Sequence, residues 1–301
     1  MTKKISLLRV CLILIVIITG ICVGFSYYTR LKEPVFLKYC VATSAVPSIT
    51  TGYQQPVLEL QYLTNNTDQR EVIGLSFAEA PDYSFIATEN AQYYGGSFTF
   101  FSNNSTPQLG EAIGPYRLRK VFLYMNNYFL EDWKGEVELN NALVNFNDGS
   151  SCKVNLGRIL IYSDGATDNA LLMMNSTSSN QGIAETTFRA QQDLNNLKME
   201  SPLIEEASRK LELTLNTHFY NEIESLHLKR GDSLTVTSCD KSDPGMIDKN
   251  DVYDVIDVRP LLTYDKENGT RGSIRIYDMM RRKYFYGYMD VLKCLIRRGV
   301  F

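Results

Sequence analysis

Apolar and polar residues alternate along most of the chain beyond residue 56, with the period of two that is typical of β-strands. Such alternation occurs at Ile73, Leu75 and Phe77, at Val121, Leu123 and Met125, and at Leu211, Leu213 and Leu215. It is clearest over residues 137–162, where the turn tripeptide Asn147-Asp148-Gly149 interrupts it. Because such a turn supplies the positive φ angle that a tight connection needs, the segment predicts a β-hairpin. A second hairpin is predicted from residues 252–264 and 273–277 around the loop DKENGT.

Two segments depart from the strand pattern. Residues 10–29 carry no charge and lie between Arg9 and Arg30. A hydrocarbon core about 30 Å thick needs roughly 20 helical residues to cross it, so this run predicts a transmembrane helix. Residues 289–298 predict a short terminal helix, because Leu292, Leu295 and Ile296 would share one face and Gly299 would cap the end.

The pattern as a whole predicts a mainly β fold: one or two β-sandwich domains, jelly-roll or immunoglobulin-like, behind a single transmembrane helix and with a short C-terminal helix. The expected division is a cytoplasmic tail at 1–9, a transmembrane signal anchor at 10–29, a stalk or linker at 30–56, a first β-rich domain or half at 57–165, and a second at 183–301 that includes the terminal helix. The small, polar residues between the halves equally fit a long loop within one domain.

A cleaved signal peptide and a lipoprotein signal are the alternatives to the anchor. Cleavage needs small residues before the site, and only bulky neighbours surround Gly20 and Gly24. A lipid-modified Cys22 would follow a small residue, whereas Ile21 precedes it. The basic residues on the two sides of the run are balanced, so charge alone does not orient it. From the usual arrangement of a short tail before a large domain, we expect the N-terminus in the cytoplasm and the main domain outside it, at the cell membrane.

Cysteine usage leaves one question open. Cys11 and Cys22 belong to the apolar run, and no Cys-x-x-Cys pair supports zinc or thioredoxin-type chemistry. The even number that remains allows three disulfide pairings in an oxidising compartment, or free buried thiols. The candidate cysteines are Cys40, Cys152, Cys239 and Cys294.

Oxygen-rich loops offer the one candidate for a metal site. Such loops can hold calcium, although none here matches the twelve-residue EF-hand pattern. Asp and Asn are equally the common residues of turns. The weak calcium candidates are Asp240, Asp243, Asp248, Asp251, Asp265 and Glu267, and no other cofactor is expected.

Catalytic signatures are missing from the sequence. It has two histidines, His218 and His227, and neither stands beside a nucleophile motif; phosphate-binding glycine loops are also absent. Residues 31–301 hold 27 of the 31 basic residues and all 34 acidic ones, a formal charge of −7 that argues against nucleic acid as a partner. The basic pairs near residues 281 and 297 are expected on a solvated face. The aromatic residues at 284–288 are expected to pack on strands, or to form a sugar platform.

These observations predict a single-pass, membrane-anchored extracytoplasmic protein that acts as a non-catalytic binding or interaction module. Its expected partners are the lipid bilayer, through residues 10–29, and a membrane or cell-envelope protein. One alternative is an anchored hydrolase that uses paired carboxylates on a cell-envelope polymer. Another is an accessory subunit of a transporter or sensor, in which the anchor helix would pack within the membrane.

Overall fold

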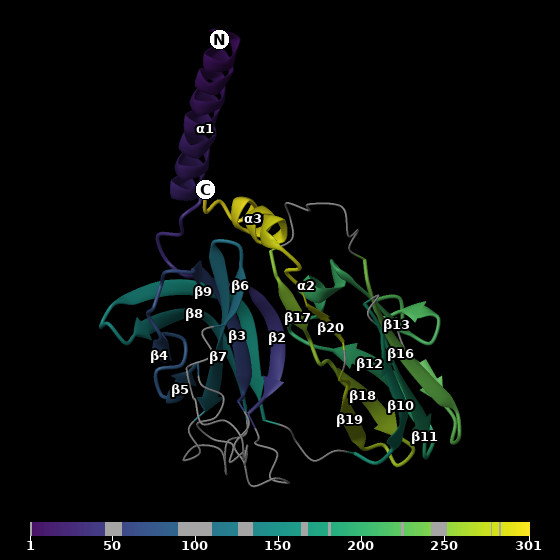
Figure 1. Cartoon of the computed structure of the whole chain (residues 1–301). Coiled ribbons are helices and arrows are strands. Elements are labelled where there is room, and N and C mark those ends of the chain that lie inside the picture. Colours follow the sequence, from purple (N-terminus) through teal and green to yellow (C-terminus); the bar gives the residue numbers. More distant parts are fainter. Residues whose placement is uncertain are drawn as a thin grey trace, which may run out of the picture.

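Four β-sheets, built around two hydrophobic cores, form the part of the chain that follows the N-terminal helix (Figure 1). The computed structural model describes residues 2–45, 56–89, 110–125, 135–163, 168–179, 182–223, 226–241, 252–277, 279–282 and 284–301. The predicted mainly β architecture, with one apolar helix at the N-terminus and one short helix at the C-terminus, is confirmed.

A six-stranded sheet lies at the centre of the arrangement, with the strand order β20-β17-β2-β9-β8-β4. Its strands are β20 (Met280–Arg282), β17 (Val255–Asp257), β2 (Tyr39–Ser44), β9 (Ser151–Tyr162), β8 (Glu136–Phe146) and β4 (Val72–Phe77). The strand β2 pairs in parallel with both β9 and β17, while the other pairs are antiparallel.

The other sheets are antiparallel. One has the order β1-β3-β7-β5, with β6 also pairing with β7: β1 (Val35–Phe36), β3 (Leu58–Asn65), β7 (Tyr116–Met125), β5 (Phe85–Thr88) and β6 (Glu111–Ile113). The next has the order β10-β11-β16-β13-β14: β10 (Leu171–Ser178), β11 (Ile183–Ala190), β16 (Ser233–Asp240), β13 (Leu211–Leu215) and β14 (His218–Phe219). The last has the order β15-β12-β18-β19: β15 (Leu226–Leu228), β12 (Leu194–Glu200), β18 (Leu261–Lys266) and β19 (Arg271–Arg275).

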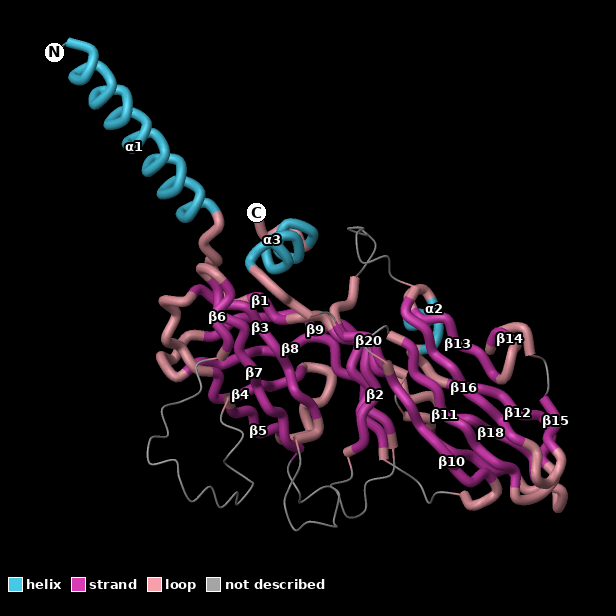
Figure 2. Tube along the Cα trace, turned by 45° about the vertical axis from the view of Figure 1, so that its right-hand side comes forward, coloured by secondary structure: helices cyan, strands magenta, loops and turns pink. Residues whose placement is uncertain are grey.

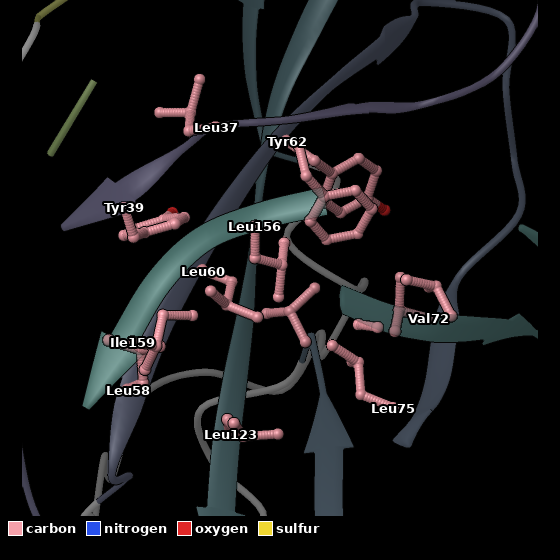
Figure 3. Close-up of a cluster of buried hydrophobic side chains, with 14 of the residues drawn as sticks. Leu37, Tyr39, Leu58, Leu60, Tyr62, Val72, Leu75, Leu123, Leu156 and Ile159 are labelled. Carbon is pink, nitrogen blue, oxygen red and sulfur yellow. The ribbon is translucent and has the colours of Figure 1, made fainter. Parts of the chain in front are cut away.

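The first core fills the space between the six-stranded sheet and the β1-β3-β7-β5 sheet. Leu60 and Leu123 approach from the second of these sheets, and Leu156 and Ile159 from β9; all are fully buried (Figure 3). The second core is formed by residues such as Phe188, Leu213 and Leu262 from the two remaining sheets.

The strands β2, β9 and β17 contribute to both cores, because successive side chains of a strand point to opposite faces. Ile159 lies in the first core and Leu160 in the second; Val255 and Ile256 divide in the same way. The six-stranded sheet is therefore covered on both faces at these strands.

The predicted hairpin at 137–162 is confirmed as β8 and β9, joined by a turn in which Gly149 has a φ of +82°. The second predicted hairpin is also present, with β18 and β19 paired around the loop that contains Gly269. Its first arm is shorter than the range 252–264, because β17 belongs to the six-stranded sheet and β18 to another.

Residues 30–45 differ from the expected stalk. They contain β1 and β2, and Leu37, Tyr39 and Cys40 are at most 1% exposed. The sequence pattern gave no local sign of this, because both strands are stabilised by pairing with distant segments. Residues 46–55, which make up most of the remainder of the expected stalk, lie outside the described residues. The division of the chain into domains stays a prediction.

The helix α1 (Thr2–Tyr28) contains the predicted span, and residues Leu8–Tyr28 are long and apolar enough to cross a membrane. A short helix, α2 (Ile204–Ser208), precedes β13. The predicted terminal helix is α3 (Tyr288–Arg297). Its end is closed by bonds from Gly299 N to Ile296 O and from Val300 N to Leu295 O, a Schellman arrangement with Gly299 at φ +67°.

The buried face of α3 differs from the predicted one. Val291, Cys294 and Leu295 pack into the first core, whereas Ile296 is 56% exposed. The helix therefore returns the chain to the first core, although most of the buried hydrophobic residues in the preceding hundred positions belong to the second core.

Candidate functional site

The strand β10 is the candidate interaction surface. It is the outer strand of its sheet among the described strands, and only Leu171 of its eight residues is buried. Leu172, Met173 and Met174 follow one another along it and are each more than half exposed, at 54%, 56% and 54%. Neighbouring surface apolar residues on an outer strand are unusual, because such an edge can pair with another chain.

The register of β10 places Leu172 and Met173 on opposite faces of the sheet, and Met173, on the face of the buried Phe188, is exposed because β10 is the outer strand. Met173 lies opposite the buried Phe188 of β11, and Leu172 lies opposite Arg189. A bulge then places Met174 out of register, between Met173 and Asn175. The bulge interrupts the strand at its apolar end, while the other end, Asn175–Ser178, is polar.

This edge can bind an extended peptide segment. The outward backbone groups of an outer strand donate and accept hydrogen bonds, and side-chain pockets or apolar contacts then select the partner. Methionine suits such a surface because its unbranched side chain adapts to different shapes. The sequence signal for this surface was the apolar run Ala170–Met174 within the small, polar stretch 163–182, whose composition otherwise fits a domain boundary or a loop.

The opposite edge of the same sheet, β14, has a different character. It is two residues long, and its exposed apolar residue is Phe219, at 41%. His218 lies beside it and is exposed. The other histidine, His227, is exposed on β15, where its Nδ1 lies 2.8 Å from the Asn195 side-chain oxygen.

A largely buried carboxyl, Glu89, was not singled out from the sequence. Its Oε1 accepts hydrogen bonds from the Tyr62 hydroxyl and from the Val72 backbone nitrogen, each at 2.6 Å, and its Oε2 lies 2.7 Å from Arg119 Nε. Burial raises the pKa of Glu89. Because its oxygens are engaged by β3, β4 and β7, this residue joins strands rather than facing a cleft.

The calcium candidates fall into three groups. Asp240, on β16, pairs with Arg281, with 3.1 Å between Oδ2 and Nε. Asp265 accepts a hydrogen bond from Asn196 at 2.8 Å, and Glu267 lies in the exposed turn after β18. Asp243, Asp248 and Asp251 lie outside the described residues. Within the described ranges, no three His, Cys, Asp or Glu side chains gather as a metal site would require, and calcium binding stays a prediction.

The four candidate cysteines are free thiols in this structure. Cys40 belongs to the second core and Cys294 to the first, while Cys152 and Cys239 are half-buried on β9 and β16. Burial raises the pKa of the Cys40 thiol to about 12, which keeps it protonated and unreactive at neutral pH. Disulfide pairing among these cysteines stays a prediction.

The basic residues near the end of the chain are not on a solvated face, contrary to expectation. The side chains of Arg297 and Arg298 are 6% and 12% exposed, and both pair with the fully buried Asp254. Arg297 Nη2 lies 2.9 Å from Asp254 Oδ1. Besides interacting favourably with the helix dipole, these arginines connect the end of α3, through ion pairs with Asp254, to the segment before β17.

The aromatic group at 284–288 separates into buried and exposed members. Phe285 is buried, and Tyr288 stacks on Tyr116 with 5.9 Å between ring centroids. Tyr284 and Tyr286 are 60% and 89% exposed, with 6.2 Å between their ring centroids.

Comparison with known proteins gives little beyond the geometry. No family model matches the chain, and no curated protein matches it. Among solved structures, a crystal structure of the YadV chaperone is similar over 81% of this chain and 100% of that chain, with 9% sequence identity and a TM-score of 0.24. A likeness this distant carries no argument about fold or function.

Proposed function

We propose that the protein is a single-pass, membrane-anchored binding module whose β domain lies outside the cytoplasm and pairs with an extended segment of a protein partner along β10. The observation that carries this proposal is the outer strand with three consecutive exposed apolar residues, Leu172, Met173 and Met174. Monomeric soluble proteins rarely expose several neighbouring large apolar side chains on an outer strand unless that surface binds something.

The proposed fold is a pair of β-sandwiches that share the six-stranded sheet. Each core is enclosed between sheets, which supports this reading: the first lies between the six-stranded sheet and the β1-β3-β7-β5 sheet. The second combines residues of the β10-β11-β16-β13-β14 and β15-β12-β18-β19 sheets with Cys40, Leu160 and Ile256. A rigid scaffold of this kind holds the β10 edge in place for binding.

The proposed location rests on α1, whose apolar residues from Leu8 to Tyr28 are not buried against the rest of the protein. A reporter that is active only outside the cytoplasm, fused after Phe301, is expected to be active, and a cytoplasmic reporter at the same position is expected to be silent. The reverse pattern would contradict both the orientation and an extracytoplasmic partner.

Replacing Leu172 and Met174 by Lys is expected to abolish partner binding while leaving the fold intact, because both side chains are exposed and lysine protects strand edges from pairing. A photo-crosslinking residue at Met173 would be introduced into the full chain in its native membrane, and the crosslinked product would be identified in the presence and absence of the two lysines. We expect one stoichiometric adduct that the lysines reduce at least about tenfold, as loss of an interface anchor does.

Phe219→Lys is the matched control, since it places the same charge at an exposed apolar position on the opposite edge of that sheet. It is expected to leave the adduct unchanged. An adduct that persists in the Leu172→Lys/Met174→Lys variant, or that is lost equally in Phe219→Lys, would contradict binding along β10. An adduct with a transporter or sensor component would identify the accessory-subunit form of this function.

A further inference from the structure

The chain enters the β domain directly where α1 ends, without a free linker. Thr29 and Leu31 are 3% and 4% exposed. The Tyr116 hydroxyl donates a hydrogen bond to Thr29 O at 2.7 Å, and the Asn65 side chain bonds both the backbone nitrogen and the backbone oxygen of Leu31, at 3.0 and 2.7 Å. If α1 spans the bilayer to Tyr28, the end of the domain that carries these contacts lies at the membrane surface.

The helix α3 lies at this same end of the domain, beside the base of α1 (Figure 1; Figure 2). The ring of the last residue, Phe301, is 6.1 Å from that of Tyr28. While one side of α3 packs into the first core, Met289, Lys293 and Ile296 are exposed. Their spacing of four and three residues places them on a single face, turned away from the core.

The exposed face of α3 has the composition of a helix that lies in a membrane interface. Met289 and Ile296 are 58% and 56% exposed, and Tyr286, just before the helix, is 89% exposed. Such helices bury their apolar face about 5–10 Å deep at the headgroup boundary, with lysine and aromatic residues alongside.

A basic groove of about 1610 Å³ lies between α1 and the domain. Its walls include Tyr27 and Phe301. They also include three lysines: Lys32, Lys38 and Lys153. None of the three forms an ion pair with a described residue, and Glu33 is the single acidic residue among those that line the groove. Unpaired lysines within a Debye length of the surface attract anionic lipid headgroups.

We propose that α3 and the basic groove form a second membrane-binding surface, which lays the end of the domain on an anionic bilayer around the base of α1. This inference rests on the proposed anchoring and adds to it: the domain is held against the lipid rather than free to swing on its helix. Met289 and Ile296 enter the interface, and the three lysines bind phosphate groups of the lipids.

Tryptophan quenching in the full chain tests this surface. In a Trp133→Phe background, which removes the single native tryptophan, Ile296→Trp and Met289→Trp would each be reconstituted in bilayers whose acyl chains carry bromine. Ile86→Trp on β5 is the matched control, because Figures 1 and 2 place β5 at the end of the domain opposite α1. Quenching at Ile296 and Met289 is expected to exceed that at Ile86 at least about twofold, as shallow insertion requires.

An Ile15→Trp variant separates the two levels of the proposal. One outcome would be strong quenching of the tryptophan at residue 15, together with quenching at residues 289 and 296 that does not exceed that at residue 86. It would contradict the second membrane-binding surface but would still support the transmembrane anchor. Absence of quenching at residue 15 would overturn the anchor itself.

The lipid charge is tested in the same system, with and without phosphatidylglycerol. Quenching at Ile296 is expected to increase with the anionic lipid, and this increase is expected to disappear when Lys32, Lys38 and Lys153 are replaced by Gln. Equal quenching in both lipid mixtures would overturn the role of the groove.

Discussion

Replacing Asp254 by Asn is expected to lower the free energy of unfolding by about 3–5 kcal/mol, the cost of removing one partner from a buried ion pair. Asp254 is fully buried, and it accepts a hydrogen bond from the Lys38 backbone nitrogen at 2.9 Å in addition to its pairs with Arg297 and Arg298. Asparagine preserves the shape but leaves two guanidinium groups without a counter-charge. Burial lowers the pKa of Arg298, because removing a guanidinium group from water disfavours its charged form.

The measurement is chemical denaturation of the detergent-solubilised full chain, followed by circular dichroism. Asp82→Asn is the matched control, because Asp82 is exposed and the same change there should alter stability by less than about 0.5 kcal/mol. If the two variants unfolded at the same denaturant concentration, Asp254 would not hold α3 in place as the contacts indicate.

Replacing Gly157 by Ala is expected to cost more than about 3 kcal/mol, because backbone strain and a steric clash act together. Gly157 lies on β9 with a φ of +92°, in a region that side chains other than glycine rarely occupy. An added Cβ would meet the Tyr39 backbone oxygen, and it would lie 2.9 Å from the Tyr39 nitrogen. Since Tyr39 is the residue of β2 that pairs with Gly157, the clash would force the parallel strands apart.

Gly149→Ala isolates the contribution of the clash. Gly149 has a similar φ of +82°, but nothing lies within 4 Å of the position that a Cβ would take. Strain alone should therefore cost about 1 kcal/mol there. Thermal unfolding of the two variants measures the difference, and equal losses would contradict the close approach of β2 to β9.

Local patterns predicted the elements that local chemistry determines. The turn Asn147-Asp148-Gly149 fixes the β8–β9 hairpin within a few residues, and Gly299 closes α3 where its position predicted. The uncharged run at 10–29 likewise predicted α1, because length and composition suffice to recognise such a helix. In each case the interactions that decide the element lie within a short stretch of sequence.

Long-range pairing decided what the sequence did not predict. The strand β2 is stabilised by residues near 157 and 255, so nothing around residue 40 distinguished it from a stalk. The charges of Arg297 and Arg298 predicted side chains exposed to solvent. Only the folded structure shows that both pair with the buried carboxylate of Asp254. The exposure of Leu172 and Met174 depends on the position of β10 at the outside of its sheet, which alternation alone does not reveal.

The parallel placement of β2 between β9 and β17 also determines when the six-stranded sheet can be completed during synthesis. Val41 and its neighbours leave the ribosome soon after α1, yet the strand that completes their second edge, at residues 255–257, follows more than 200 residues later. Distant contacts of this kind form slowly and leave edges exposed in the meantime. Until residues 255–257 are synthesised, the second edge of β2 stays unpaired, and the cell's quality-control machinery can recognise such an open sheet.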